Sequence, residues 1–507
     1  MKSRPVAVTP PTRPITRHRR FVCGLLGVAV LVSACSSRTA TKTGRPANNA
    51  AAAVATSATP VGMISHHGRW LIDGAGRVII VHGVNMVEKS APYYPAAAGF
   101  GADDAAWISQ HGFNVVRLGV LATGLMPQPG RIDPTYLARL AATVAQLARD
   151  HIFVLLDFHQ DGWGPAVGDD GFPPWMTLTG TATNSHTTFP LYYITNPAIQ
   201  QSFQSFWDNA AGPGGTRLQD QFAAMIRAVA ARFATNPAVI GYDVFNEPWP
   251  GTTWSACLND AAGCPTLDHG ELDPFYAGTS RALRAVDRNH LLFVEPFVLF
   301  NYGQSTTSVS LPGADPSAGL SFHLYTLDVA HEPKVLANAL GWSRATTGAL
   351  MNTEWGATSD PATITREAGE LDHAMIPWIF WSYDELVSNL RRAPGSGAFP
   401  TAAADALARA YPSVVAGTPA EFAFDAATRT LAFSWSTNRP GGGGYPTGTV
   451  TAFEVPATAY PDGYSIVAAG ARVTSEPCAP IATVAVLAGV KRASVRISPA
   501  GGCTPGN

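Results

Sequence analysis

The chain has 507 residues, of which 46% are hydrophobic and 14% are charged, and its formal net charge is −2. This length allows more than one domain, each with a substantial core. Because the charges nearly balance, we expect no nucleic-acid partner, and specificity for any ligand must come from local sites.

The N-terminus has the features of an export signal. An arginine-rich stretch at 17–20 precedes an apolar run at 21–34 that is short for a bilayer span. The run ends in Leu31-Val-Ser-Ala-Cys35, which resembles the lipobox of bacterial lipoproteins. We therefore predict a signal peptide at 1–35, lipidation of Cys35, and an exported protein anchored on the membrane surface of the cell envelope. An ordinary cleaved signal peptide, giving a secreted protein, is the alternative.

The next segment, 36–65, is rich in Ala, Thr, Ser and Asn and has few large apolar residues. Such a composition buries too little apolar surface to fold, so we predict a disordered linker. A linker of this kind would let an anchored domain sample the membrane surface at high effective concentration.

From 66 to 412, short apolar runs alternate with amphipathic stretches of helical period. A Gly-containing turn inside 68–78 predicts a β-hairpin. The later runs are apolar throughout, as in parallel strands covered on both faces, and they lie at 78–84, 115–120, 153–159, 240–245, 292–295, 320–325, 350–354 and 377–381. Helices are predicted between them, including 134–149, 219–233, 273–286 and 402–410. The pattern predicts a (β/α)8 TIM barrel. A doubly wound open sheet is the alternative, but it would not explain why polar residues follow so many strands.

After residue 412 the pattern changes to short β-prone runs separated by Gly and Pro. We predict a small β-sandwich at 413–507, with strands at 421–424, 430–436, 452–455, 463–468 and 494–497. Only 481–487 suggests a helix. This domain could bind carbohydrate or stabilise the barrel, and the lack of a clear aromatic strip favours the structural role.

Four cysteines remain once Cys23 and Cys35 are assigned to the signal, and an even number in an exported protein indicates two disulfides. Of the three possible pairings, sequence proximity favours Cys257 with Cys264 and Cys478 with Cys503. No CxxC or HxxxH spacing accompanies them, so we expect no metal site and no cofactor.

Ionisable, amide and aromatic residues gather at the ends of the predicted barrel strands. In a barrel these ends converge on one mouth, where active sites lie. The residues are Arg117, His159, Asp161, Asn246, Glu247, His323, Tyr325, Glu354 and Trp381. Taken singly, several have structural interpretations: Arg117 could pair with a buried carboxylate, His159 could be a core histidine, and Trp381 could be core.

Glu247 and Glu354 have the weakest structural interpretation, because a buried glutamate is rarely tolerated without a role or a partner. Both follow apolar strands, in Asn246-Glu-Pro248 and in Asn352-Thr-Glu354. Two carboxyl groups in one cavity can cleave a glycosidic bond, one protonating the leaving oxygen and the other attacking the sugar carbon.

The ordered set Arg117, His159, Asn246-Glu-Pro248, His323-Leu-Tyr325, Glu354 and Trp381 resembles glycoside hydrolase family 5. The resemblance implies that Glu247 is the acid/base and Glu354 the nucleophile. The motifs Asp157-Phe-His-Gln-Asp161, Ala91-Pro-Tyr-Tyr-Pro95 and Phe245-Asn-Glu-Pro-Trp-Pro-Gly251, with the trailing β-domain, look like the endoglycoceramidases and related glycosylceramidases. Those enzymes cleave the bond between a glycan and ceramide. Trp355 departs from the pattern, because Phe more often follows the nucleophile.

We therefore expect a monomeric, retaining hydrolase acting on a glycolipid or oligosaccharide, with its two carboxyl groups about 5–5.5 Å apart. Glu247 should stay protonated near neutral pH, while Arg117 should keep Glu354 charged. His159 and Asp161 should bind sugar hydroxyls, Asn246 the 2-hydroxyl, and Trp381 a sugar face. The alternatives are a hydrolase of β-glucan or mannan polysaccharides and a non-catalytic glycan-binding lipoprotein.

Overall fold

The structure, a computed structural model, describes residues 56–258, 262–308, 315–325, 328–387 and 401–503. The predicted signal peptide, Cys35 and the first part of the predicted linker lie outside these residues. Within them, none of the helices combines the length and the apolar composition that a membrane crossing requires.

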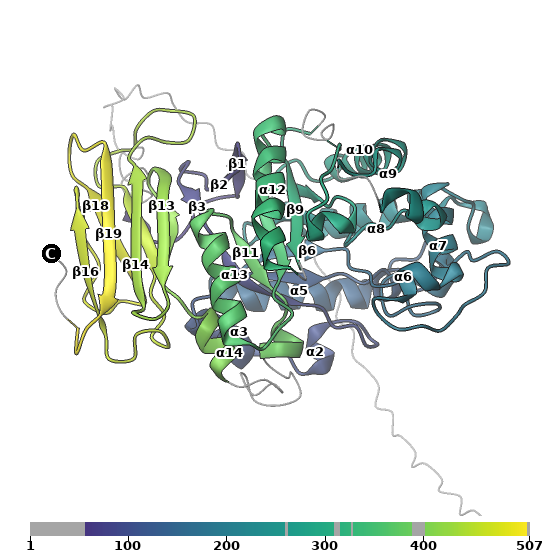
Figure 1. The fold of residues 1–507 in the computed structure, drawn as a ribbon, viewed down its shortest axis with the longest axis horizontal. Helices are drawn as coiled ribbons and strands as arrows, with labels where there is room; N and C mark the ends of the chain where they lie inside the picture. The colour runs from purple at the N-terminus through teal and green to yellow at the C-terminus, as the bar shows by residue number, and fades with distance from the viewer. Residues whose placement is uncertain (1–55, 259–261, 309–314, 326–327, 388–400, 504–507) are drawn as a thin grey trace, which may run out of the picture. The chain divides into compact units, whose positions relative to one another are not determined.

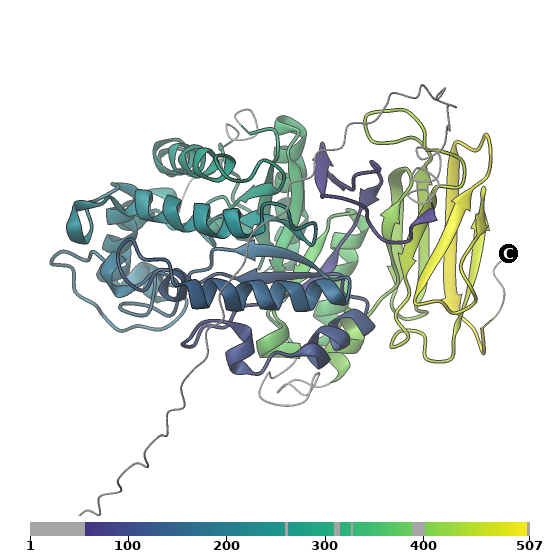
Figure 2. The same cartoon turned by 180° about the vertical axis from the view of Figure 1, so that it is seen from behind.

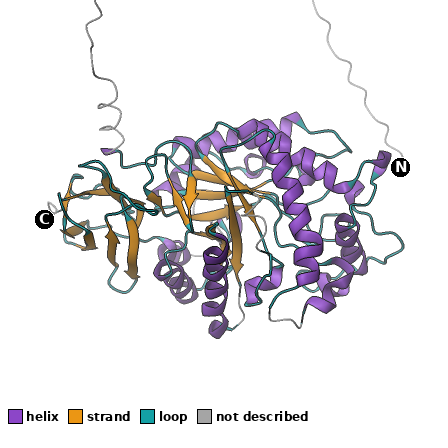
Figure 3. Cartoon of the chain, turned by 90° about the horizontal axis from the view of Figure 1, so that it is seen from above, coloured by secondary structure: helices purple, strands orange, loops and turns teal. Residues whose placement is uncertain are grey.

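Parallel strands close into a barrel, which confirms the predicted fold class. The strands follow one another around the barrel in chain order, each paired in parallel with the next, and β10 and β11 complete the ring to β4. Figure 3 shows these strands in orange, flanked by helices in purple. They are β4 (His82–Met86), β5 (Val115–Gly119), β6 (Phe153–Asp157), β7 (Val239–Asp243), β8 (Leu291–Val294), β9 (Ala318–Leu324), β10 (Ala349–Trp355) and β11 (Trp378–Phe380).

Helices connect the strands and cover the barrel, and Figures 1 and 2 show α5 and α8 from opposite sides. Helix α5 begins where the sequence predicts, because the Asp133 carboxylate accepts from the backbone N–H groups of Thr135 and Tyr136, and Pro134 takes the first helical position. The α-helices are α2 (Pro95–Ala98), α3 (Ala102–Gln110), α4 (Ala122–Leu125), α5 (Pro134–Arg149), α6 (Tyr192–Thr195), α7 (Pro197–Trp207), α8 (Leu218–Phe233), α9 (Pro265–Leu267), α10 (Asp273–Arg284), α12 (Glu332–Thr346), α13 (Pro361–His373) and α14 (Thr401–Leu407).

The run at 78–84, predicted as one strand, belongs to two sheets. Strand β3 (Val78–Ile79) pairs with β2 (Trp70–Ile72) in the predicted hairpin and with β12 of the C-terminal domain, whereas β4 begins the barrel. Every residue of the run is buried, in one core or the other. A continuous apolar run therefore could not reveal where the chain passes between the two sheets.

The C-terminal domain is a two-sheet antiparallel structure, which agrees with the predicted sandwich. One sheet has the order β1-β2-β3-β12-β15-β18-β17 and the other β13-β14-β19-β16. Residues 66–79, which we predicted to be part of the barrel domain, therefore belong to the first of these two sheets instead. The segment 481–487 is strand β18 rather than a helix, because its alternate residues pack into the sandwich core. The remaining strands are β1 (Ser65–His67), β12 (Tyr411–Val415), β13 (Thr418–Asp425), β14 (Thr430–Ser436), β15 (Val450–Glu454), β16 (Tyr464–Ala469), β17 (Ala471–Val473), β18 (Ile481–Val486) and β19 (Arg492–Pro499).

The last ten residues of the predicted linker, 56–65, are ordered, which corrects that prediction. The buried Arg77 guanidinium pairs with Asp73 and donates to the backbone oxygens of Ser57 (2.6 Å) and Thr59 (2.8 Å). Ile64 is fully buried in the core beneath the barrel. The composition of the segment gave no sign of this because its partners lie further along the chain.

Disulfides join Cys257 to Cys264 and Cys478 to Cys503, the pairing that sequence proximity favours. The first disulfide begins at Cys257, the last residue of η3 (Gly251–Cys257), which follows Glu247 in the chain. The second ties the end of the described chain to the sandwich.

Inside the barrel, side chains form layers because every second residue of a strand points inward. One layer is apolar and includes Val115, Leu155, Phe293 and Met351. Two residues further along these strands the inward residues are polar, so the polar groups collect at the carboxyl ends of the strands.

Candidate active site

Arg117, fully buried on β5, is the centre of the polar layer. Its guanidinium contacts four carboxylates at 2.5–3.0 Å, and those carboxylates belong to Asp157, Asp243, Glu295 and Glu354. Burial alone would lower the pKa of Arg117, but the surrounding carboxylates raise it well above its usual value. Both interpretations of Arg117 therefore hold, since it pairs with buried carboxylates and one of them is Glu354.

Glu354 reaches the mouth through an irregularity in β10. The register of β10 against β9 shifts between Asn352 and Glu354, which turns the Glu354 side chain into the barrel. One carboxylate oxygen accepts from Arg117 at 2.5 Å and the other from the Tyr325 hydroxyl at 3.0 Å. The Glu354 side chain is 6% exposed, so a carboxyl group held by two donors still reaches the cavity.

The protonation of Glu354 is set by opposing effects. Burial raises its pKa, and the neighbouring His323 and Arg117 partly offset that rise. Arg117 lowers the pKa of Glu354, as the expectation requires, but burial outweighs this effect, so the pKa of Glu354 is raised overall.

Glu247 lies in the turn after β7 with a left-handed backbone, φ 44°. This conformation is uncommon for a residue with a side chain, and such positions concentrate at functional sites. Its carboxylate accepts from Asn301 at 2.9 Å and contacts the His323 ring at 2.8 Å. Its backbone N–H donates to Glu295 at 2.8 Å. The turn is therefore fixed by contacts from three separate segments.

The two sequence-predicted carboxyl groups share one pocket. One carboxylate oxygen of Glu247, one of Glu354 and a ring nitrogen of His323 all lie within 4.8 Å of one another. The His323 ring also contacts Glu295 at 3.3 Å. Burial lowers the pKa of His323, but Glu295 and Glu354 outweigh burial and raise it well above its usual value. A charged His323 balances the acidic groups that surround it.

A second group of predicted residues lines the same cavity beside the carboxyl pair. The His159 ring contacts Asp157 at 2.7 Å and Asp161 at 3.4 Å, and it stacks on Trp381 with ring centres 5.4 Å apart. Burial lowers the pKa of His159, but the two aspartates raise it well above its usual value. A flat aromatic beside charged and hydrogen-bonding groups is the combination that binds a sugar ring.

Asn246 lies deeper than the other predicted residues. Its oxygen accepts from Arg117 at 2.9 Å, and its amide nitrogen donates to the backbone oxygen of Gln160 at 3.1 Å. Asn246 is 1% exposed, and its contact with the sugar 2-hydroxyl stays a prediction.

Sequence reasoning missed several buried polar residues at this end of the barrel, and Glu295 has the most contacts. It accepts from Arg117 and from the Glu247 backbone, and burial raises its pKa to about 8, opposed by His323. The one feature of the sequence that could have predicted a site role for Glu295 is its position directly after β8. The others are Asn85, Asp157, Asp170, Asp243 and Asn301, together with the partly exposed Lys89.

Among the residues that the structure describes, two groups have metal-ligand atoms within 4.8 Å of one another, namely His159 with Asp161 and Asp170, and Glu247 with His323 and Glu354. In each, a basic side chain already contacts a carboxylate. Lys89 Nζ lies 2.5 Å from Asp161, and the Arg117 guanidinium lies 2.5 Å from Glu354. Because a basic side chain already balances a carboxylate in each group, both groups are better suited to binding a sugar than to binding a metal cation.

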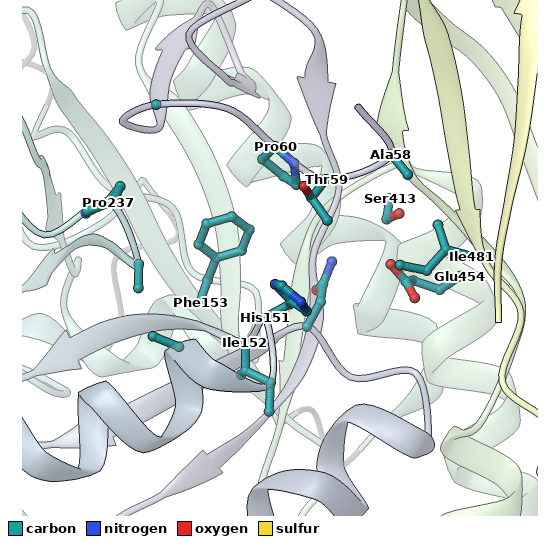
Figure 4. Close-up of a pocket in the computed structure, with 14 residues that line it drawn as sticks. Ala58, Thr59, Pro60, His151, Ile152, Phe153, Pro237, Ser413, Glu454 and Ile481 are labelled. Atoms are coloured by element: carbon teal, nitrogen blue, oxygen red, sulfur yellow. The ribbon is translucent and has the colours of Figure 1, made fainter. Parts of the chain in front are cut away.

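The cavity itself is lined by Glu247 and Glu354 together with aromatic and polar residues, which include Lys89, His159, Asp161, Phe189, Tyr302, Tyr325 and Trp381. A second cavity lies at the opposite ends of the strands, where Phe153 begins β6 and Pro237 precedes β7 (Figure 4). It contains none of the predicted site residues, so the chemistry belongs to the first cavity.

Two carboxyl groups facing one cavity at the carboxyl end of a parallel barrel, with cationic and aromatic groups around them, define a glycoside hydrolase. The chain belongs to glycosyl hydrolase family 5. The family described as cellulase (glycosyl hydrolase family 5) matches residues 81–386, and the glycoside hydrolase family 5 C-terminal domain matches residues 409–497.

Several relatives of this chain within the family are named endoglycoceramidase. The chain is 31% identical over 465 residues to endoglycoceramidase I of Rhodococcus hoagii (strain 103S), covering 84% of this chain and 86% of that protein. It is 28% identical over 412 residues to an endoglycoceramidase of Hydra vulgaris, covering 72% and 76%. The solved complex of endo-glycoceramidase II from Rhodococcus sp. with ganglioside GM3 has a TM-score of 0.71 at 25% identity, covering 85% of this chain and 99% of that one.

Proposed function

We propose that this enzyme hydrolyses the β-glycosidic bond between a glycan and a ceramide-type lipid, with retention at the anomeric carbon. The observation that carries the proposal is the closeness of Glu247 and Glu354 in one cavity. Such closeness suits direct attack by one carboxylate, whereas inversion needs carboxyl groups about 6.5–9.5 Å apart with a water between them. The relatives named endoglycoceramidase support the lipid aglycone.

The two glutamates differ in their surroundings, and this assigns their roles. Arg117 and Tyr325 donate to Glu354, which stabilises its carboxylate and aims it as the nucleophile. Glu247 has no arginine contact among those described, and it accepts from Asn301 and contacts His323, which suits a group that must give and regain a proton.

In the first step, a Glu354 oxygen bonds to the anomeric carbon while the bond to the aglycone oxygen breaks. Glu247 gives its proton to that oxygen, and the sugar is left as an ester of Glu354. In the second step, water gives a proton to Glu247 as its oxygen attacks the same carbon, which releases the sugar and restores both carboxyl groups. The similar structure of the lactosyl-enzyme intermediate of endo-glycoceramidase II from Rhodococcus sp. supports this order of steps.

A panel of substrates tests the aglycone. Monohexosylceramides, oligosaccharide ceramides, sterol glucosides and soluble β-glucans are each incubated with the enzyme, and products are separated into free glycan and free lipid. We expect intact glycan and ceramide from the glycosylceramides. Hydrolysis of β-glucans with no release of ceramide would assign the enzyme to polysaccharides instead.

We also propose that the enzyme is exported, anchored through Cys35 and active as a monomer. The sequence at 17–35 supports the anchor, and a bilayer is where a glycolipid substrate resides. Metabolic labelling with a fatty acid should mark the wild type and leave Cys35→Ser unlabelled. Label on both proteins would contradict the anchor, and sedimentation measures the oligomeric state.

A further inference from the structure

A patch of exposed apolar side chains lies at the mouth of the active-site cavity. Phe189, Leu191 and Ile194 are 55%, 58% and 43% exposed. Phe189 also lines the cavity, as does Tyr302, which is 42% exposed and ends the short helix η5 (Val298–Tyr302). The apolar surface that faces water is therefore continuous with the cavity.

The two segments that carry this patch have no formally charged residue. Between Gly171 and Trp207 the sequence has no Asp, Glu, Lys or Arg, although these residue types make up 14% of the chain. The segment 296–308, which contains Tyr302, also lacks them. The nearby Asp169 accepts a hydrogen bond from the Tyr192 hydroxyl at 3.0 Å. A surface that must enter an apolar phase avoids charges because their desolvation is costly.

The exposed residues project from an anchored base. The Tyr193 hydroxyl accepts from the Gly162 backbone at 3.0 Å, and its ring packs against Trp249, two residues after Glu247. Asn196 is fully buried and donates to the Val167 backbone at 3.1 Å and to the Asn184 side chain at 2.8 Å. Because the buried contacts of Tyr193 and Asn196 hold the segment in place, its exposed apolar side chains are kept in a fixed position at the surface.

We propose that Phe189, Leu191 and Ile194 form a rim patch that inserts into the surface of a lipid bilayer and brings the cavity to a glycolipid there. The proposal rests on the proposed function for the identity of the substrate. The patch is uncharged, so its binding depends on apolar burial and should change little with salt or with the fraction of anionic lipid. This distinguishes it from a polybasic membrane site.

A kinetic comparison tests the patch. The variant Leu191→Ser/Ile194→Ser leaves Phe189 intact, because Phe189 lines the cavity. The matched control is Val467→Ser/Leu487→Ser, which changes residues that are 57% and 49% exposed on the C-terminal domain. Each full-length protein hydrolyses glycosylceramide in phosphatidylcholine vesicles, and a soluble aryl β-glycoside. We expect the first variant to lose about tenfold on vesicles at limiting lipid and to keep its soluble rate, while the control keeps both.

Equal vesicle rates for wild type and the rim variant would overturn the proposal, as would an equal loss on both substrates. If the wild type hydrolyses no glycosylceramide, the proposed function has failed, and insertion is then decided directly. A fluorophore attached at Leu191→Cys should be quenched by bromine-labelled lipids, whereas one at Val467→Cys should not. An unquenched label at 191 would overturn the proposal. So would a concentration-dependent dimer that Leu191→Ser/Ile194→Ser abolishes, because the patch would then belong to a second copy of the chain.

Discussion

The two ends of the barrel are formed by the same strands, but one end is a packed apolar core and the other contains the ionisable groups of the active site. On β5, β6 and β8 an inward apolar residue near the start is followed two positions later by an inward ionisable one, as Val115 is by Arg117 and Phe293 by Glu295. The start of the strands contains tightly packed aliphatic and aromatic side chains. The carboxyl end contains charges whose burial must be compensated pair by pair. The residues that stabilise the barrel and the residues that form the active site therefore lie on the same strands, about two positions apart.

The largest effect should come from Glu354. Replacing it by Gln keeps the shape but removes the nucleophile, so turnover should fall by about 10⁴-fold or more while the unfolding temperature changes little. Steady-state rates and thermal unfolding measure both quantities. A Glu354→Gln enzyme with wild-type turnover would contradict the role of the carboxyl end.

Arg117 should affect both chemistry and stability. Arg117→Met leaves Asp157, Asp243 and Glu295 buried without their shared cation, and we expect a loss of about 3–5 kcal/mol in the free energy of unfolding together with loss of turnover. Arg117→Lys, the matched control, keeps one charge and should recover part of the stability. Denaturant unfolding decides this, and an unchanged midpoint for Arg117→Met would show that the carboxylates are compensated by other means.

Leu155 tests the opposite end. It is fully buried in the apolar layer, two residues before Asp157, and Leu155→Ala should cost about 2–5 kcal/mol of stability. Turnover measured well below the new unfolding temperature should stay within about threefold of wild type. A large loss of turnover with little loss of stability would mean that the two ends are not separable.

The smallest effect is expected at Glu454, which lines the cavity in Figure 4. Burial raises the pKa of this carboxyl to about 7, and the nearby Ser413 hydroxyl partly opposes the rise. Because the folded state holds the proton more tightly than the unfolded chain, the stability contribution is fully present below about pH 4 and is lost as pH rises to about 7. Glu454→Gln should match wild type near pH 4 and exceed its stability by about 1–3 kcal/mol at pH 8. Denaturant unfolding at both pH values checks this, and equal stability at pH 8 would contradict it.

The sequence predicted the parts of the site that have a local pattern. Glu247 follows an apolar strand and Glu354 lies near the end of another, and Asn246 and Tyr325 stand at fixed spacings from a neighbouring motif residue, so the local pattern predicts both carboxyl groups. Glu295 also follows a strand, but its roles depend on contacts with Arg117 and Glu247, which are far away in sequence. Such long-range pairing has no local signal.

The fold shows the same limit. The capped helix α5 was predicted to the residue, because Asp133 and Pro134 mark its start. The passage between sheets within 78–84, the ordering of 56–65 by Arg77 and the strand at Ile481–Val486 were missed. In each case the deciding partner lies in another domain or another strand, so tertiary contacts overrode the local composition.

Trapping with a 2-fluoroglycoside tests the central claim most directly. The fluorine slows breakdown of the glycosyl ester, so the intermediate should accumulate, and peptide mass spectrometry then locates the sugar. Attachment at Glu354, with still slower breakdown of the ester in Glu247→Gln because the general base is lost, is the result the structure predicts. Attachment at any other residue, or full turnover of natural substrate by an enzyme that never forms the ester, would contradict it.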